Sequence, residues 1–191
     1  RSVVDPVASP GASQWTPLHG IGAMIFATVG TQGPFYRLIR TIDGWAGANG
    51  RTEIFAQTGP SDYRSEHIRT KRFIDATEFR ERVEAASLVI SHAGMGSIIT
   101  ALELGKRIIV MPRLASLGEH RNDHQVATAK RFAEQGAITV AFTEPELIDK
   151  LDQLPRLHET GRLTAQASPH LISAIRMFIG TGWAGVDRSI V

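Results

Sequence analysis

A histidine, two glycines and a serine lie close together in the segment SHAGMGS, residues 91–97, and these residue types suit an anionic ligand. His92 can donate a hydrogen bond from its ring, and Ser97 from its hydroxyl group. Gly94 and Gly96 let the backbone approach a ligand closely. A helix that begins at Ser97 would add unpaired N–H groups and a partial positive charge, worth about 0.3–1 kcal/mol to an anion. A phosphate or diphosphate is therefore the first ligand to consider, although a tight turn with a serine cap fits the same letters equally well.

Three familiar glycine and serine motifs do not fit this segment. A dinucleotide fingerprint needs a third glycine where Ile99 stands, and a hydrolase nucleophile elbow needs a glycine at the same place. A P-loop needs Gly-Lys-Ser or Gly-Lys-Thr, which the segment lacks. A plain NAD-dependent oxidoreductase is therefore disfavoured.

A longer polar segment, PRLASLGEHRNDHQ, offers a second group of candidates at residues 112–125. His120 and His124 are four residues apart, but Arg121 stands where a His-Glu-x-x-His zinc motif needs its glutamate, so no metal site is predicted. The segment also contains partners for the hydroxyl groups of a sugar or ribose, namely Asn122, Asp123 and Gln125. A solvated loop whose Asp123 caps the next helix is the alternative interpretation.

The elements that must position these groups alternate between strand and helix. We expect strands at residues 24–30, 52–59, 71–75, 88–91, 108–112 and 137–142. Helices are expected at 34–46, at 78–86 with a Thr77 cap, at 97–105, at 122–136, and at 144–154 behind a Thr143–Glu146 capping box. Because the strands are apolar throughout, the predicted fold is α/β, a Rossmann-like doubly wound parallel sheet.

In such sheets ligands bind at the carboxyl ends of the strands. Three loops would meet there: the two segments above and the segment GTQGPF after the first strand. In this last loop Gly30, Thr31 and Gln32 would approach a diphosphate or an acceptor, although an ordinary strand-end turn is an equal alternative.

Composition narrows the class of protein. The 191 residues carry a net charge of only +2, which gives no reason to expect a nucleic acid partner, and they contain no cysteine for disulfides or thiolate metal sites. The apolar stretches are too short for a membrane span, so we expect a cytoplasmic protein. We interpret residues 1–23 as a linker, a tail or added sequence, and residues 24–167 as one domain. Residues 168–191 would form an amphipathic helix and tail that pack on the domain or dock a partner.

The spacing of His92, Gly94 and Ser97 resembles the donor-nucleotide signature of GT-B glycosyltransferases, most closely the family 28 C-terminal domain. The resemblance implies a single GT-B donor-binding lobe in which these residues hold the diphosphate of a UDP-sugar. Thr100 stands where the family often has a ribose-binding glutamate, and Glu119 is a candidate replacement. Gln125 falls in the region where the family binds the sugar.

The segments MIFATVGTQGPFYRLI and LGEHRNDHQ resemble the donor-binding subunits of bipartite transferases. These include bacterial exopolysaccharide subunits of the PssE type and the eukaryotic subunit that adds the second GlcNAc to dolichol pyrophosphate. The resemblance implies an inverting transfer to a lipid-linked acceptor and a membrane-associated acceptor-binding partner at the inner face of the membrane. It also implies that no metal cofactor is obligatory.

The hypothesis therefore combines a donor site with a separate acceptor subunit. The candidate catalytic residues are His92 and Glu119. The candidate substrate-binding residues are Gly30, Thr31, Gln32, His92, Gly94, Met95, Gly96, Ser97, Thr100, Glu119, His120, Asn122, Asp123 and Gln125. Two alternatives stay open: a non-enzymatic UDP-binding or regulatory module, and a UDP-sugar epimerase-like protein.

Overall fold

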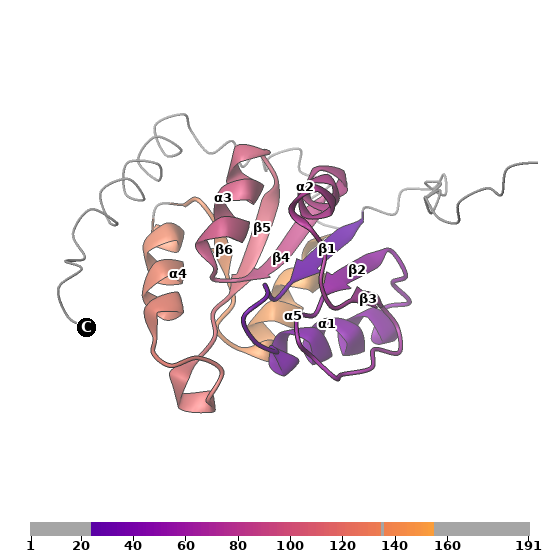
Figure 1. Cartoon of the computed structure of the whole chain (residues 1–191), viewed down its shortest axis with the longest axis horizontal. Helices are drawn as coiled ribbons and strands as arrows, with labels where there is room; N and C mark the ends of the chain where they lie inside the picture. Colours follow the sequence, from indigo (N-terminus) through magenta and orange to yellow (C-terminus); the bar gives the residue numbers. More distant parts are fainter. Residues whose placement is uncertain (1–23, 135, 155–191) are drawn as a thin grey trace, which may run out of the picture.

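The computed structural model of the chain describes residues 24–134 and 136–154. Within this part, six strands form one sheet in the order β3-β2-β1-β4-β5-β6, and every neighbouring pair is parallel (Figure 1). This arrangement confirms the predicted doubly wound fold. The strands are β1 (Ile25–Thr28), β2 (Ile54–Gln57), β3 (Arg69–Lys71), β4 (Leu88–His92), β5 (Arg107–Met111) and β6 (Thr139–Val140). The helices are α1 (Tyr36–Ala48), α2 (Ala76–Ala85), α3 (Met95–Glu103), α4 (His124–Glu134), α5 (Glu144–Asp152) and the 3₁₀ turn η1 (Ala115–Leu117).

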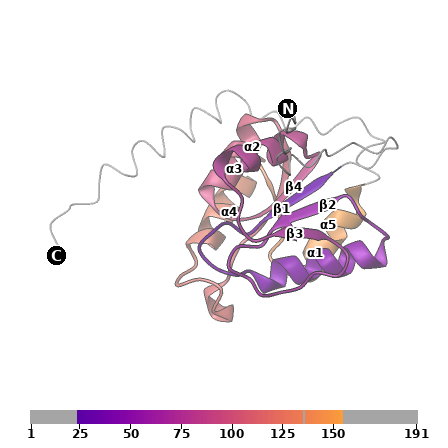
Figure 2. The same ribbon diagram turned by 45° about the vertical axis from the view of Figure 1, so that its right-hand side comes forward.

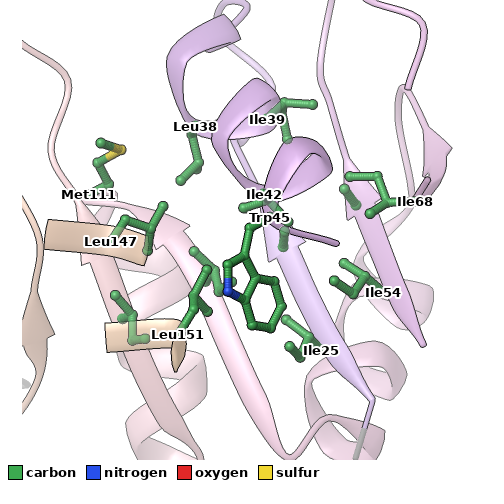
Figure 3. Close-up of a cluster of buried hydrophobic side chains, with 14 of the residues drawn as sticks. Ile25, Leu38, Ile39, Ile42, Trp45, Ile54, Ile68, Met111, Leu147 and Leu151 are labelled. Atoms are coloured by element: carbon green, nitrogen blue, oxygen red, sulfur yellow. The ribbon is translucent and has the colours of Figure 1, made fainter. Parts of the chain in front are cut away.

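Two layers of helices cover the sheet. Helices α1 and α5 lie on one face, and α2, α3 and α4 lie on the other (Figures 1 and 2). Because successive strand residues point to opposite faces, Ile25 joins the core under α1 and α5, whereas Phe26 joins the core under the other helices. Figure 3 shows the first core, where Trp45 of α1 lies beside Leu147 and Leu151 of α5.

Packing and capping both hold α5 in place. Leu147 and Leu151 are fully buried, and each contributes about 2 kcal/mol through burial. The predicted Thr143 cap is confirmed, since its hydroxyl accepts from the Glu146 N–H at 3.3 Å. The Glu146 carboxylate accepts from the Phe142 N–H at 2.9 Å, one residue before the position that a capping box would use. The cap contributes about 1 kcal/mol, so packing stabilises this helix more than capping does.

Several predicted boundaries differ from the structure, and three of them lie beside the loops at the carboxyl end of the sheet. The third strand ends at Lys71 instead of beginning there, so Phe73 and Ile74 lie beyond it. Helix α2 is capped by Asp75, whose carboxylate accepts from the Glu78 N–H at 2.9 Å, and not by Thr77. Helix α3 begins at Met95, two residues before the predicted start at Ser97. Thr77 and Ser97 lie within their helices, Ile74 lines a pocket, and Phe73 is exposed.

Strand β3 forms one edge of the sheet, and its three residues Arg69, Thr70 and Lys71 are all exposed. Among the strands that the structure describes, it pairs only with β2. The opposite edge is β6, which is two residues long. Both edges are thus short, and one of them is cationic.

The order of the strands reverses between β1 and β4, which are neighbours in the sheet but are separated in sequence by two strands. Thr28 at the end of β1 is in register with Ser91 in β4. The loops after these strands, which begin with Val29 and Ala93, therefore leave the sheet side by side. This switch point is where open α/β sheets bind ligands.

Candidate functional site

The His92 ring is packed between two glycines from different loops. A Cβ atom placed on Gly30 would lie 2.8 Å from His92 Cε1, and one placed on Gly94 would lie 2.7 Å from the same atom. Gly30 also has a φ of +75°, which favours glycine over any other residue. Both glycines are needed here because the imidazole fills the space that a side chain would take.

His92 is neutral at physiological pH. Burial is the main cause that lowers the pKa of His92 to about 4, and the positive charge of Arg113 contributes. A hydrogen bond with the Thr28 backbone acts in the opposite direction, and the Ser91 hydroxyl lies 3.4 Å from His92 Nδ1. A neutral imidazole can donate one hydrogen bond to an anion, but it brings no charge of its own.

Helix α3 presents its first turn to the same space. The first N–H that bonds within the helix belongs to Ile98, which donates to Gly94 O at 3.2 Å. The N–H groups of Met95, Gly96 and Ser97 precede it, and no side chain caps them. A Cβ on Gly96 would meet nothing within 4 Å, so the space beside it is open to a ligand. The predicted N–H donors are therefore present, and the helix that carries them starts earlier than expected.

The loop after β1 is held by a chain of hydrogen bonds. The Gly30 N–H donates to Thr28 Oγ1 at 3.2 Å, and that hydroxyl donates to Gln57 Oε1 at 2.7 Å. Thr28 and Gln57 are both buried. The relay fixes the start of the loop, and the next residues, Thr31 and Gln32, line the pocket beside His92.

Two pockets meet at this point. One has a volume of about 290 Å³ and is lined by Val29, Gly30, Thr31, Gln32, His92, Gly94, Gly96, Ser97 and Gln125. The other has a volume of about 300 Å³ and is lined by Thr28, Gly30, Thr31, Gln57, Ile74, Asp75, Ala76, Phe79, Gly96, Ser97 and Thr100. We call them the β4 pocket and the β2 pocket. They share Gly30, Thr31, Gly96 and Ser97, so the first turn of α3 and the loop after β1 both lie at their common boundary.

The β2 pocket was not predicted from the sequence. Its apolar wall consists of Ile74 and Phe79, and its polar wall includes Gln57 and Asp75. The sequence does contain a signal, because Phe73 and Ile74 form an apolar pair in an otherwise polar stretch. An apolar pair of this kind is equally typical of a short strand, which is why it predicts a strand and not a pocket wall.

Glu119 and Thr100 lie apart. Thr100 lines the β2 pocket and donates to Gly96 O at 2.9 Å, whereas Glu119 lines a third pocket, of about 590 Å³, with Arg113 and His120. Both carboxylate oxygens of Glu119 accept from Arg37, each at 2.8 Å, and one also accepts from the Leu114 N–H. The structure thus does not bring Glu119 to the predicted ribose position beside Thr100.

Of the remaining predicted site residues, one lines the β4 pocket and the others lie outside it. Gln125 lines the β4 pocket, and Met95 is half-buried against the core under α3. Asn122 and Asp123 are exposed and bond within their own loop, where Asp123 accepts from the Ala115 N–H at 3.0 Å. His120 lines the third pocket. Among residues 24–134 and 136–154, no cluster of three or more metal-ligating side chains occurs.

A doubly wound parallel sheet with unpaired N–H groups at its switch point defines a Rossmann-like ligand-binding lobe. The family model of the glycosyltransferase family 28 C-terminal domain matches residues 24–170, and the chain belongs to that family. This finding confirms the predicted family.

Two relatives carry the name UDP-N-acetylglucosamine transferase subunit ALG13. The Mus musculus protein is 32% identical over 79 residues, which are 41% of this chain and 6% of that protein. The Candida glabrata protein is 38% identical over 73 residues, which are 38% of this chain and 34% of that protein. The chain therefore matches only a minor part of either relative.

Solved structures share the fold. An NMR solution structure of ALG13 has a TM-score of 0.56 at 22% identity, over 84% of this chain and 97% of that one. The crystal structure of UDP-GlcNAc 2-epimerase from Neisseria meningitidis bound to UDP-GlcNAc has a TM-score of 0.56 at 12% identity, over 87% of this chain and 45% of that one. In the part of our chain that the structure describes, every helix is too short or too polar to cross a bilayer.

Proposed function

We propose that this chain is the donor-binding subunit of a bipartite inverting glycosyltransferase that uses a UDP-sugar. The observation that carries the proposal is the meeting of two loops at the switch point. The first turn of α3 and the loop after β1 place N–H groups at the boundary of two pockets. Such a boundary suits a diphosphate whose two substituents extend in opposite directions.

The linings of the two pockets suggest which substituent each one takes. The β2 pocket has an apolar wall of Ile74 and Phe79 beside polar groups, which suits a flat base and a ribose. The β4 pocket is lined by Gln32, His92 and Gln125, which suits the hydroxyl groups of a sugar. We therefore assign the uridine to the β2 pocket and the sugar to the β4 pocket. UDP-N-acetylglucosamine is the first donor to test, because both ALG13 relatives are named as subunits of a UDP-N-acetylglucosamine transferase.

The transfer itself is a displacement at the anomeric carbon. The acceptor hydroxyl oxygen forms the new bond, the bond from the anomeric carbon to the phosphate oxygen breaks, and UDP leaves with the electron pair. The α3 N–H groups and Ser97 stabilise the growing charge of the leaving diphosphate, and neutral His92 donates one hydrogen bond to it. The acceptor proton passes to a base that we assign to the acceptor-binding subunit.

Glu119 takes a different part in this proposal. Its carboxylate is paired with Arg37, so we assign it to holding the loop after β5 in place and not to ribose binding or catalysis. The acceptor is a lipid-linked sugar, and a membrane-associated partner brings it to the cytoplasmic face. Exopolysaccharide synthesis is the pathway class that the sequence resemblance favours.

The test is calorimetric titration of the 191-residue chain with UDP, with GDP and ADP as controls. Gly96→Asp places a carboxylate at the boundary of the pockets, and it should weaken UDP binding by about 100-fold or more through like-charge repulsion. Gly44→Asp is the matched control, since Gly44 is also helical and exposed and has nothing within 4 Å of its Cβ position. Equal UDP affinities for the two variants would overturn the proposed site.

Adding the acceptor subunit separates the remaining functions. Sugar transfer that requires both proteins supports the bipartite enzyme. UDP binding without transfer in the presence of the partner would favour the regulatory module. Interconversion of the sugar by this chain alone would favour the epimerase-like protein.

A further inference from the structure

Arg113 is a buried arginine at the end of β5 that the proposed reaction does not use. Its exposed fraction is 4%, and its guanidinium lies 4.7 Å from the centre of the Phe35 ring. The guanidinium donates hydrogen bonds to four backbone carbonyl groups. These belong to Val29 at 3.0 Å, Gly33 at 2.8 Å, Pro34 at 2.6 Å and Glu119 at 3.5 Å.

This bonding pattern makes Arg113 unsuited to bind a ligand directly. An arginine has five N–H donors, and the four on its two terminal nitrogens are directed at these carbonyl groups. Three of the four carbonyl groups belong to the loop after β1, on either side of Thr31 and Gln32. The guanidinium therefore holds this loop through its carbonyl groups.

The opposite side of the loop faces the pocket. Thr31 and Gln32 line the β4 pocket, and their N–H groups take part in none of the hydrogen bonds found within the described part of the chain. A loop of this kind has no regular structure to keep those N–H groups in place. Its orientation depends on what holds its carbonyl groups.

The backbone of Arg113 holds a second pocket residue. The Arg113 N–H donates to Gln125 Oε1 at 3.1 Å, which fixes the amide oxygen and so directs the amide N–H donors to the other side of the group. Gln125 comes from the start of α4, whereas Gln32 comes from the loop after β1. One residue thus fixes polar groups from a loop and a helix that line the same pocket.

We propose that Arg113 is the positioning residue of the donor site: it orients the N–H groups of Thr31 and Gln32 and the amide of Gln125 toward the ligand without contacting the ligand. This inference rests on the proposed function, and it adds a residue that the sequence pattern did not single out. The positive charge of Arg113 also favours binding, because a buried cation below the pocket attracts a diphosphate.

The positive charge of Arg113 also lowers the pKa of His92. Arg113 and His120 both disfavour the protonated imidazole, and Glu119, the nearest carboxylate to Arg113, is paired with Arg37. Replacing Arg113 by a neutral residue should therefore raise the pKa of His92. Replacing it by lysine should leave that pKa low.

Two variants separate the shape of the side chain from its charge. Arg113→Lys keeps the charge, but one ammonium group cannot reach three carbonyl groups of the loop in the planar arrangement of a guanidinium. Arg113→Met removes both. Arg80→Met is the control, because Arg80 is exposed and pairs only with Glu84 of the same helix among the contacts described. Each variant of the full chain is titrated with UDP well below its melting temperature.

Loss of positioning should weaken UDP binding by about tenfold in Arg113→Lys and further in Arg113→Met. Amide hydrogen exchange in residues 29–34, where the Val29 and Gly30 N–H groups are hydrogen-bonded, should rise in both variants and stay unchanged in α5. His92 should titrate by NMR near its wild-type pKa in Arg113→Lys and at a higher pKa in Arg113→Met.

A merely structural arginine would lower the melting temperature and leave UDP affinity and exchange in residues 29–34 at wild-type values, which would overturn the inference. Failure of the proposed function is distinguishable, since UDP binding would then be insensitive to Gly96→Asp as well. In that case the exchange of residues 29–34 still decides whether Arg113 holds the loop.

Discussion

Two loops of this protein are organised around a buried charge, and the charges have opposite signs. Asp43 in α1 accepts from the N–H groups of Glu66, His67 and Ile68 and from the Tyr63 hydroxyl. Arg113 instead donates to four carbonyl groups, three of them in the loop after β1. A carboxylate thus leaves the carbonyl side of its loop free, whereas a guanidinium leaves the N–H side free.

The difference explains where each kind of buried charge is used. A loop that binds an anion presents N–H groups, and a cationic partner for its carbonyl groups favours that orientation. A loop that only leads into a strand has no such requirement, and the loop before β3 can use its N–H groups internally. The two buried charges should therefore differ in function as well as in sign.

Removing the anion should have the largest effect on stability. Asp43→Ala leaves three N–H groups and a hydroxyl without their acceptor, and we expect the free energy of unfolding to fall by about 3–5 kcal/mol. Urea denaturation at pH 7 measures this loss. UDP affinity, titrated under conditions where the variant is folded, should stay within about threefold of wild type. A larger loss of UDP affinity would mean that the Asp43 loop also serves the site.

The pH dependence of stability should report on both buried charges: on Arg113 through His92, whose pKa it lowers, and on Asp43 directly. His92 has a pKa of about 4 in the folded chain, against about 6.5 when unfolded, so the unfolded chain binds more protons between these values. Stability should therefore fall by up to about 3 kcal/mol as the pH decreases from 7 to 4. Urea denaturation across this range should show a flatter profile for His92→Gln, whereas His124→Gln, at an exposed histidine, should follow wild type.

A second decline should follow at lower pH. Burial acts to raise the pKa of Asp43, but its hydrogen bonds outweigh burial and hold the pKa below the ordinary value. The stability that this carboxylate provides is present above about pH 4 and is lost as the pH falls through the lowered pKa. A stability profile that stays flat from pH 7 to 4 in wild type would contradict the assignment of His92 as a buried neutral base.

Glu119→Gln separates the two roles considered for this residue. If the carboxylate holds the loop through Arg37, stability should fall by about 2 kcal/mol while UDP affinity stays within about threefold of wild type. Denaturation and calorimetry on the same preparation measure both quantities. A loss of UDP affinity of about tenfold or more, with little change in stability, would restore the ribose contact expected from the sequence.

The smallest effect is expected from Thr143→Ala, which removes the cap of α5 and belongs to neither loop. Its loss should cost about 1 kcal/mol of stability, measured by thermal or urea denaturation, and leave UDP binding unchanged. This variant shows how much a local loss of stability alone changes UDP binding. If its effect on UDP binding matched that of Arg113→Lys, the Arg113 effect would reflect stability alone.

Much of the fold followed from the sequence because its signals are local. Continuous apolar runs predicted five of the six strands with small errors at their ends, and glycine and threonine predicted the end of α3 and the start of α5. The glycines around His92 predicted a close approach of backbone to another group, and Gly30 and Gly94 do pack against the His92 ring.

The parts that sequence reasoning missed depend on long-range contacts. Arg113 reaches carbonyl groups about eighty positions earlier in the chain, and no local pattern reveals such a partner. Phe73 and Ile74 suggest a strand because strand cores and pocket walls use the same apolar residues. Glu119 was a ribose candidate because Thr100 stands where the family often has a glutamate, and the hydrogen bonds from Arg37 show that its carboxylate is engaged.

The short cationic edge at β3 affects how readily two copies of the chain can pair through their sheets. Exposed sheet edges are templates on which other chains can add a strand, and long apolar edges lead to aggregation. Here Arg69 and Lys71 would face the same charges on a second copy of the chain, and only three residues are available for pairing. An edge of this kind disfavours strand pairing between two copies of the chain, even at high concentration.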